Sequence, residues 1–151
     1  MNPNWHILLV EDNPDHAELV RRSLEGFPAI QLFHLEDGEV ALDYLFGRGI
    51  YAERGRFPPP DLVLLDLRLP RVDGLEVLRL VQQHPPLAVT PIVVLTTSDA
   101  ERDVAAAFEY HASHFLTKPV DVQRLGRLLY DLGYGRSAGP EPPPPGRSLT
   151  P

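Results

Sequence analysis

Four short apolar runs in this chain each lead into a polar residue that could take part in phosphoryl chemistry. The first run leads into the acidic pair Glu11 and Asp12, and the second leads into Asp66. The third leads into the hydroxyl of Thr96, and the fourth leads into the ammonium of Lys118. Three carboxylates, a hydroxyl and an ammonium could together hold Mg²⁺ and accept a phosphoryl group, provided that the fold gathers them in one place.

The carboxylates of Glu11, Asp12 and Asp66 would need a cation nearby if they lie close together. Two unit charges about 4 Å apart interact by about 4 kcal/mol at an effective dielectric constant near 20, so Glu11, Asp12 and Asp66 would repel one another and raise at least one carboxyl pKa. Mg²⁺ relieves this repulsion, because it prefers oxygen ligands and is usually held by one or two carboxylates. Asp66 lies between Leu65 and Leu67. A carboxylate in such apolar surroundings is usually functional or paired, and it could act as a nucleophile that forms an aspartyl phosphate.

Each of these residues also has a plainer interpretation. The acidic pair could cap a helix or solvate a loop, and Asp66 could be a solvated residue at the end of a strand. Thr96 could be an ordinary β-branched strand residue, and Lys118 a surface lysine before a turn. Their matching positions after four apolar runs favour the functional interpretation.

The apolar runs predict the strands of a buried parallel sheet. They are about four residues long, are bounded by turn residues and are separated by helix-length stretches, as in sheets covered on both faces. A more polar edge strand is expected at 30–35. The four runs are Ile7–Val10, Leu62–Leu65, Ile92–Leu95 and Phe115–Thr117. Since ligands bind outside the carboxyl ends of the strands in open α/β sheets, the polar residues should meet at one edge.

Five helices are expected between and after the strands. Asn13 is a favoured N-cap and Pro14 suits a first helical position, so the first helix begins there and Gly26 with Pro28 stops it. Its inner face is expected to carry Ala17, Leu19, Val20, Ser23 and Leu24. The other helices are predicted to begin at 38, 73, 98 and 121 and to end near 46, 83, 110 and 132. We therefore predict an α/β fold of the flavodoxin-like, doubly wound type, a (βα)₅ chain whose five-stranded parallel sheet has the order 2-1-3-4-5.

Composition divides the chain into one domain and a tail. Residues 1–133 suffice for a single core, with a long connection expected at 47–60. Residues 134–151 are rich in proline and poor in apolar groups, so we expect a disordered tail that cannot offset its ordering entropy.

Charge and composition exclude several function classes. The formal charge of −7 gives no support for nucleic-acid binding, and the absence of cysteine removes thiolate chemistry. No apolar stretch is long enough to span a membrane, and the N-terminus does not resemble a secretory signal. We expect a cytoplasmic protein with no membrane or nucleic-acid partner.

The chain resembles the receiver domain of two-component response regulators, including the single-domain chemotaxis regulator, over about residues 5–132. The matching segments are LLVEDNP, DLVLLDLRLPRVDG, PIVVLTTSD and HFLTKPV. The resemblance implies that Asp66 is the phosphoacceptor and that Lys118 binds the phosphate, preceding a cis peptide bond to Pro119. It implies Mg²⁺ ligation by Asp12, Asp66 and the backbone carbonyl of Arg68, with Glu11 acting through water. Thr96 matches the switch hydroxyl and Phe115 the switch aromatic residue.

A narrower resemblance is to the small stand-alone receivers that are paired with bacterial phytochrome histidine kinases. It rests on the long connection at 47–60, the Thr96-Thr97-Ser98 run and the segment TKPVD. The chain departs from many receivers at Thr97, where Ala or Gly is common, which narrows access to the site. Phe115 lacks the hydroxyl of a switch tyrosine, so its rotation would be driven by packing alone.

The resemblance implies a signalling module and no enzyme beyond its own phosphorylation and dephosphorylation. Its partners would be a sensor histidine kinase, of the phytochrome type, and a second copy of the chain. The homodimer would form through the fourth helix, the last strand and the fifth helix, which carry surplus apolar residues: Val104, Phe108, Tyr110, Phe115 and Val120.

Two other kinds of protein, a phosphatase and a flavodoxin, share some of these features. A haloacid-dehalogenase-type phosphatase also combines Asp, Thr or Ser, Lys and Mg²⁺, but it needs a second Asp two places after the nucleophile, where this chain has Arg68. A flavodoxin would bind flavin phosphate at the loop after the first strand, but the acidic residues Glu11 and Asp12 in that loop would repel a phosphate.

Overall fold

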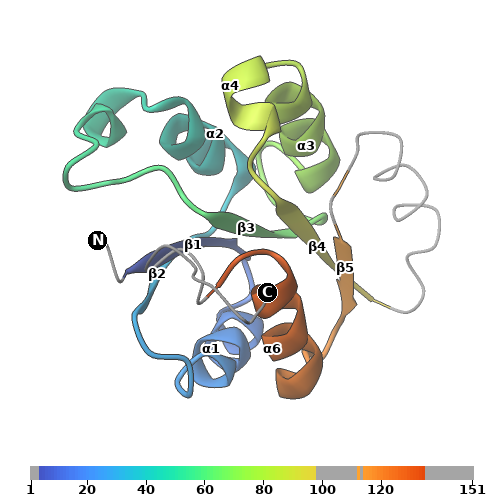
Figure 1. Ribbon diagram of the computed structural model, residues 1–151. Helices are drawn as coiled ribbons and strands as arrows, with labels where there is room; N and C mark the ends of the chain where they lie inside the picture. Colours follow the sequence, from blue (N-terminus) through green and yellow to red (C-terminus); the bar gives the residue numbers. More distant parts are fainter. Residues whose placement is uncertain (1–3, 98–111, 113, 135–151) are drawn as a thin grey trace.

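A five-stranded parallel sheet with the strand order β2-β1-β3-β4-β5 forms the centre of the molecule, as predicted (Figure 1). The computed structural model describes residues 4–97, 112 and 114–134. The strands are β1 (Trp5–Val10), β2 (Ile30–Leu35), β3 (Leu62–Asp66), β4 (Ile92–Thr96) and β5 (His114–Thr117). Every residue of β3 and β4 is buried, which explains why these two strands are continuous apolar runs rather than alternating ones.

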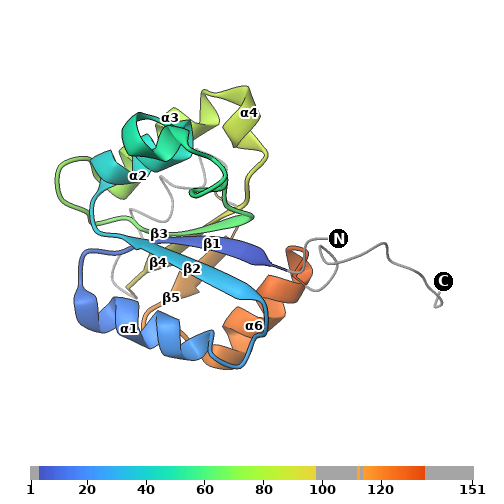
Figure 2. The same ribbon diagram turned by 90° about the vertical axis from the view of Figure 1, so that its left-hand side faces the viewer.

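Helices cover both faces of the sheet (Figures 1 and 2). One face carries α1 (Pro14–Ser23) and α6 (Val122–Asp131), and the other carries α2 (Gly38–Phe46), α3 (Gly74–Gln82) and the short α4 (Pro85–Ala88). Each face has its own hydrophobic core, one beneath α1 and α6 and the other beneath α2 and α3. None of the helices in the described part of the chain is both long enough and apolar enough to cross a bilayer.

Side-chain caps fix the helix starts near the positions predicted from the sequence. The carboxamide oxygen of Asn13 accepts hydrogen bonds from the backbone N–H groups of Asp15 and His16 at 2.8 and 3.2 Å. Asp37, Asp73 and Asp121 cap α2, α3 and α6 in the same way. These caps matter for function because α1 and α3 begin immediately beside the acidic strand ends.

The connection between α2 and β3 is ordered by Arg54. Its guanidinium donates hydrogen bonds of 2.9 and 3.0 Å to the carbonyls of Tyr44 and Leu45 at the end of α2, and one of 3.1 Å to the carbonyl of Phe57. A single 3₁₀ turn, η1 (Gly49–Ala52), lies within this connection. The partly buried guanidinium of Arg54 thus satisfies the last carbonyls of α2 and holds the long connection predicted at 47–60 against the domain.

Some sequence expectations were wrong, and others fall outside the described residues. The interpretation of Leu19 as part of the inner face of α1 was wrong, since the residue is 47% exposed. The short helix α4 was not predicted. Pro85 and Pro86 follow the third predicted helix, where proline commonly marks a helix end, but proline also suits a first helical turn. The predicted fourth helix from residue 98, with Val104, Phe108 and Tyr110, lies outside the described residues, as do residues 135–151 of the expected tail. The prediction that the tail begins at Tyr134 was wrong, since Tyr134 is 7% exposed and its hydroxyl donates to the carbonyl of Pro28.

Candidate functional site

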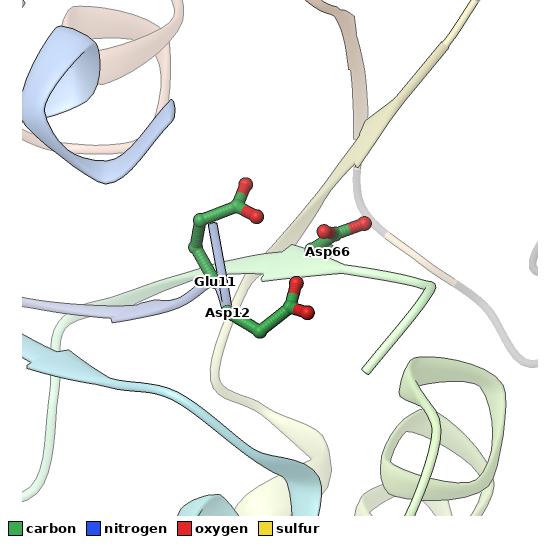
Figure 3. Close-up of side chains that lie close together, drawn as sticks. All are labelled: Glu11, Asp12 and Asp66. Atoms are coloured by element: carbon green, nitrogen blue, oxygen red, sulfur yellow. The ribbon is translucent and has the colours of Figure 1, made fainter. Parts of the chain in front are cut away.

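Three carboxylates meet at the carboxyl ends of β1 and β3. Val10 pairs with Leu65 across these strands, so Glu11 and Asp12 after β1 come beside Asp66, the last residue of β3. One carboxylate oxygen from each of the three lies within 4.8 Å of the others, and the side chains converge on a common space (Figure 3). Glu11 is 0% and Asp66 7% exposed, whereas Asp12 is exposed at the entrance. The sequence prediction of an acidic cluster is therefore realised in the geometry.

The ammonium of Lys118 lies against this cluster. Its Nζ is 2.7 Å from Oε1 of Glu11 and 3.1 Å from Oδ2 of Asp66, and its side chain is 11% exposed. The backbone N–H of Lys118 donates a 2.7 Å hydrogen bond to the carbonyl of Thr96, which extends the β4–β5 pairing to the site. The peptide bond from Lys118 to Pro119 is cis, as the family resemblance implied.

Burial and charge oppose each other at the ion pair. Burial raises the pKa of the Glu11 carboxyl above its usual range, the Lys118 ammonium partly offsets this rise, and Asp66 adds to it. Burial alone would lower the pKa of Lys118, but the hydrogen bond to Glu11 and the charge of Asp66 raise it. The ammonium therefore stays charged and compensates one of the three carboxylates.

The loop after Asp66 is folded tightly back on the strand end. Oδ1 of Asp66 accepts a 3.1 Å hydrogen bond from the backbone N–H of Arg68, and the N–H of Gly74 donates to the carbonyl of Leu67. A Cβ atom at Gly74 would lie 2.4 Å from the carbonyl oxygen of Asp66, so only glycine permits α3 to begin here. The Asp66 carboxylate is therefore fixed, because a main-chain N–H group donates to its Oδ1.

Thr96 and Phe115 occupy the neighbouring strand ends on β4 and β5. Thr96 is 8% exposed, and its hydroxyl donates a 3.2 Å hydrogen bond to the carbonyl of Thr97, which lies at the exposed rim. Phe115 is half-buried and packs against the core beneath α2 and α3. One cavity is lined by all the predicted site residues except Phe115: Glu11, Asp12, Asp66, Arg68, Thr96 and Lys118.

Two histidines at this site were not singled out from the sequence. Nδ1 of His16 lies 3.3 Å from the ammonium of Lys118, and Nε2 of His34 lies 2.7 Å from the carbonyl oxygen of Glu11. His16 comes one helical turn after Asp12, and His34 is the next-to-last residue of the edge strand. These positions relative to the acidic pair could have indicated from the sequence that both histidines lie near the site.

The donor set fits a divalent cation. Three carboxylates and one ammonium leave an uncompensated charge of about −2 around one space, and oxygen is the donor that hard divalent ions prefer. Asp12 provides the exposed side through which an ion can enter.

Comparisons with known proteins agree with this geometry. The model of the response regulator receiver domain matches residues 7–130. The chain is 44% identical to the probable methanogenesis regulatory protein FilR2 of Methanothrix harundinacea, over 89% of this chain and 88% of that protein. It is 41% identical to response regulator Rcp1 of Synechocystis, over 87% of this chain and 88% of Rcp1.

Solved structures give the same assignment. The Mn²⁺-bound form of Rcp1 superposes with a TM-score of 0.71 at 39% identity, covering 87% of this chain and 93% of that one. The bacteriophytochrome response regulator RtBRR superposes with a TM-score of 0.78 at 37% identity, covering 93% of this chain and 85% of that one. These matches favour neither a phosphatase nor a flavodoxin. The chain belongs to the response regulator receiver family of two-component signalling.

Proposed function

We propose that this chain is a single-domain response regulator that accepts a phosphoryl group from a sensor histidine kinase onto Asp66. The observation that carries the proposal is the position of the Asp66 carboxylate, which lies at a strand end inside an acidic cavity with a lysine ammonium 3.1 Å away. The proposal places the chain in the cytoplasm, where a kinase histidine is phosphorylated from ATP.

In the proposed transfer, an oxygen of Asp66 attacks the phosphorus atom of the kinase phosphohistidine. A new oxygen–phosphorus bond forms, and the nitrogen–phosphorus bond breaks with its electron pair returning to the imidazole. The ammonium of Lys118, 3.1 Å from Asp66, would bind an oxygen of the transferred group, and the hydroxyl of Thr96, which lines the same cavity, would donate to another. These two groups would stabilise negative charge on the transferred phosphoryl group.

We assign the cation to Mg²⁺, held by Asp12, Asp66 and the backbone carbonyl of Arg68, with Glu11 acting through water. When bound, Mg²⁺ would neutralise charge on the carboxylates and the phosphoryl oxygens. Arg68 lines the same cavity as the carboxylates, and the Mn²⁺-bound state of the relative Rcp1 supports a divalent ion at such a site.

Phosphorylation would act on the surface through Thr96 and Phe115. Movement of Thr96 towards the phosphoryl oxygens would vacate space beside β4, and Phe115 on the adjacent β5 would turn inward to fill it. Because the Phe115 ring has no hydroxyl, burial of its apolar surface alone would drive this rotation.

Acetyl phosphate provides the direct test. Purified protein mixed with acetyl phosphate and Mg²⁺ should gain one labile acyl phosphate per chain, measured by intact mass, and should gain none when the metal is chelated. Continuous release of phosphate from many phosphate esters, without a labelled chain, would contradict the proposal and favour a phosphatase.

The kinase partner is proposed from the relatives. RtBRR is a bacteriophytochrome response regulator, which supports a phytochrome-type kinase, whereas FilR2 is described as a methanogenesis regulatory protein. Phosphotransfer from a labelled phytochrome kinase should therefore exceed transfer from an unrelated sensor kinase at equal concentrations. The gene beside this one should encode the preferred kinase.

We also propose a homodimer through the segment from residue 98 through β5 to α6. Its predicted contact residues Val104, Phe108 and Tyr110 lie outside the described residues, while Val120 packs against the core beneath α1 and α6. A two-fold interface buries the same patch twice, so a change in Phe115 would act in both subunits. Sedimentation with and without beryllofluoride, repeated on Phe108→Asp, tests this proposal. A chain that is monomeric under all conditions, or a dimer that is unaffected by the substitution, would contradict it.

A further inference from the structure

Three side chains surround the ammonium of Lys118. It forms an ion pair with Oε1 of Glu11 at 2.7 Å and donates a 3.1 Å hydrogen bond to Oδ2 of Asp66. The third is His16, whose Nδ1 lies 3.3 Å away. Since an ammonium can only donate, Nδ1 of His16 accepts, and the ring proton is on Nε2.

His16 reaches the site from a fixed position on α1. Its backbone N–H donates to the carboxamide oxygen of Asn13, the residue that caps the helix. Its imidazole lines the acidic cavity and also the adjoining cavity beneath Leu19 and Val120. Nδ1 of His16 is 3.9 Å from Oε2 of Glu11, too far for a hydrogen bond, so the ammonium is its closer polar neighbour.

We propose that His16 is a positioning residue for Lys118. The inference rests on the proposed function, in which Lys118 binds an oxygen of the phosphoryl group on Asp66. Formation of the acyl phosphate removes the negative charge of Asp66 and weakens it as an acceptor, which frees one N–H of the ammonium to turn towards the phosphoryl group. The ion pair with Glu11 and the hydrogen bond to His16 remain, so the nitrogen stays in place while its other hydrogen bond changes partner.

Two substitutions at residue 16 distinguish the effect of losing the hydrogen-bond acceptor from the effect of changing the side-chain shape. The Oδ1 atom of asparagine lies at about the same distance along the side chain as Nδ1 of histidine, whereas leucine has a similar branched shape and no acceptor. With beryllofluoride as the phosphoryl analogue and saturating Mg²⁺, His16→Leu should bind about fivefold more weakly, as expected for one partly exposed hydrogen bond to a charged group. His16→Asn should bind within about twofold of the wild-type chain, since it keeps that hydrogen bond. Fluorine NMR titration measures both affinities.

Three further measurements distinguish this role from a structural one. Mg²⁺ affinity without beryllofluoride and the thermal unfolding midpoint should be unchanged in both variants, since the His16 side chain is 44% exposed. His114→Leu, a substitution of an exposed histidine at the start of β5, serves as the matched control. In a Lys118→Met background, His16→Leu and His16→Asn should have equal beryllofluoride affinities, because no ammonium remains to be positioned.

Failure of this inference differs from failure of the proposed function. Equal beryllofluoride affinities of His16→Leu and His16→Asn in the presence of Lys118, or a difference that persists in Lys118→Met, would overturn the role of His16 alone. A wild-type chain that does not bind beryllofluoride with Mg²⁺ would overturn the proposed function itself.

Discussion

The imidazole of His34 donates a 2.7 Å hydrogen bond from Nε2 to the backbone carbonyl of Glu11. A carbonyl can only accept, so Nε2 carries the proton in this contact. The backbone N–H of Glu11 donates to the carbonyl of Leu35, at 3.0 Å. Both main-chain groups of Glu11 are therefore tied to the end of β2, and this edge strand sets the direction in which the acidic pair enters the site.

Removal of the His34 imidazole should loosen the acidic pair. We expect His34→Ala to weaken Mg²⁺ binding by about threefold to tenfold, because loss of the hydrogen bond to the Glu11 carbonyl lets the Glu11–Asp12 peptide reorient. His34→Gln, which keeps a donor, should recover most of the affinity. Isothermal titration calorimetry measures the three values, with His114→Ala as the control. Equal affinities in all four chains would show that the contact does not position the pair.

Asp66→Asn tests the phosphoacceptor. Asp66 is 7% exposed in the acidic cavity, and its carboxamide replacement is too weak a nucleophile to form the acyl phosphate. The variant should show no mass gain with acetyl phosphate and Mg²⁺. Asp61→Asn, a change in an exposed residue before β3, is the control and should label normally. Continued labelling of Asp66→Asn would assign the phosphate to another residue.

Asp12→Ala tests direct metal binding. We expect Mg²⁺ affinity to fall at least tenfold, or about 1.4 kcal/mol. Tryptophan fluorescence is not a suitable readout, although Trp5 is close to Asp12 in the sequence. Trp5 begins β1 and Asp12 follows its other end, so they are about 20 Å apart at roughly 3.3 Å per residue. Trp5 is also buried in edge-to-face contact with Tyr134. Calorimetry avoids this problem, and an unchanged affinity would contradict a direct ligand role for Asp12.

The sheet and the acidic cluster could be predicted because periodicity and strand-end position determine both. A strand buried on both faces must be a continuous apolar run, and parallel strands bring their carboxyl ends to one edge. Glu11, Asp66 and Lys118 could therefore be placed together from the sequence. The strand order followed from the flavodoxin-like, doubly wound arrangement expected for a (βα)₅ chain.

The contacts of His16 and His34 could not be predicted, because they depend on side-chain direction rather than on element order. His34 lies on a strand whose residues alternate between the two faces, and the sequence does not show that its ring reaches across to the Glu11 carbonyl. Arg54 presents the same difficulty, since its hydrogen-bond partners come from α2 and from a loop with no regular period. Exposure of Leu19 was missed because an apolar residue on a helix is not always on the buried face.

Gly38→Ala tests the contact that holds α2 against the loop after β3. A Cβ atom at Gly38 would lie 1.7 Å from the carbonyl oxygen of Val72, so the helix or the loop must move. We expect the free energy of unfolding to fall by more than about 2 kcal/mol, within the range of strong overpacking. Gly26→Ala is the control, because a Cβ atom there has no heavy atom within 4 Å outside its chain neighbours. Urea unfolding followed by circular dichroism measures both, and equal stabilities would show that the loop yields freely.

Tyr44→Phe should make the protein less sensitive to alkali. Tyr44 is 3% exposed and donates a 2.8 Å hydrogen bond to the carbonyl of Pro58. Burial raises the pKa of its phenol above the usual value near 10, and the Arg54 guanidinium opposes this only in part. The unfolded chain therefore loses the phenolic proton at lower pH than the folded chain, so the stability that this group contributes is fully present below about pH 10 and declines as pH rises through the folded pKa.

At pH 8 the variant should be less stable by about 1 kcal/mol, the value of one hydrogen bond. Between pH 10 and 11 it should lose less stability than the wild-type chain. Tyr130→Phe, at a side chain that is 55% exposed, is the control. Parallel alkaline curves for the wild-type chain and Tyr44→Phe, from urea unfolding at each pH, would contradict the prediction.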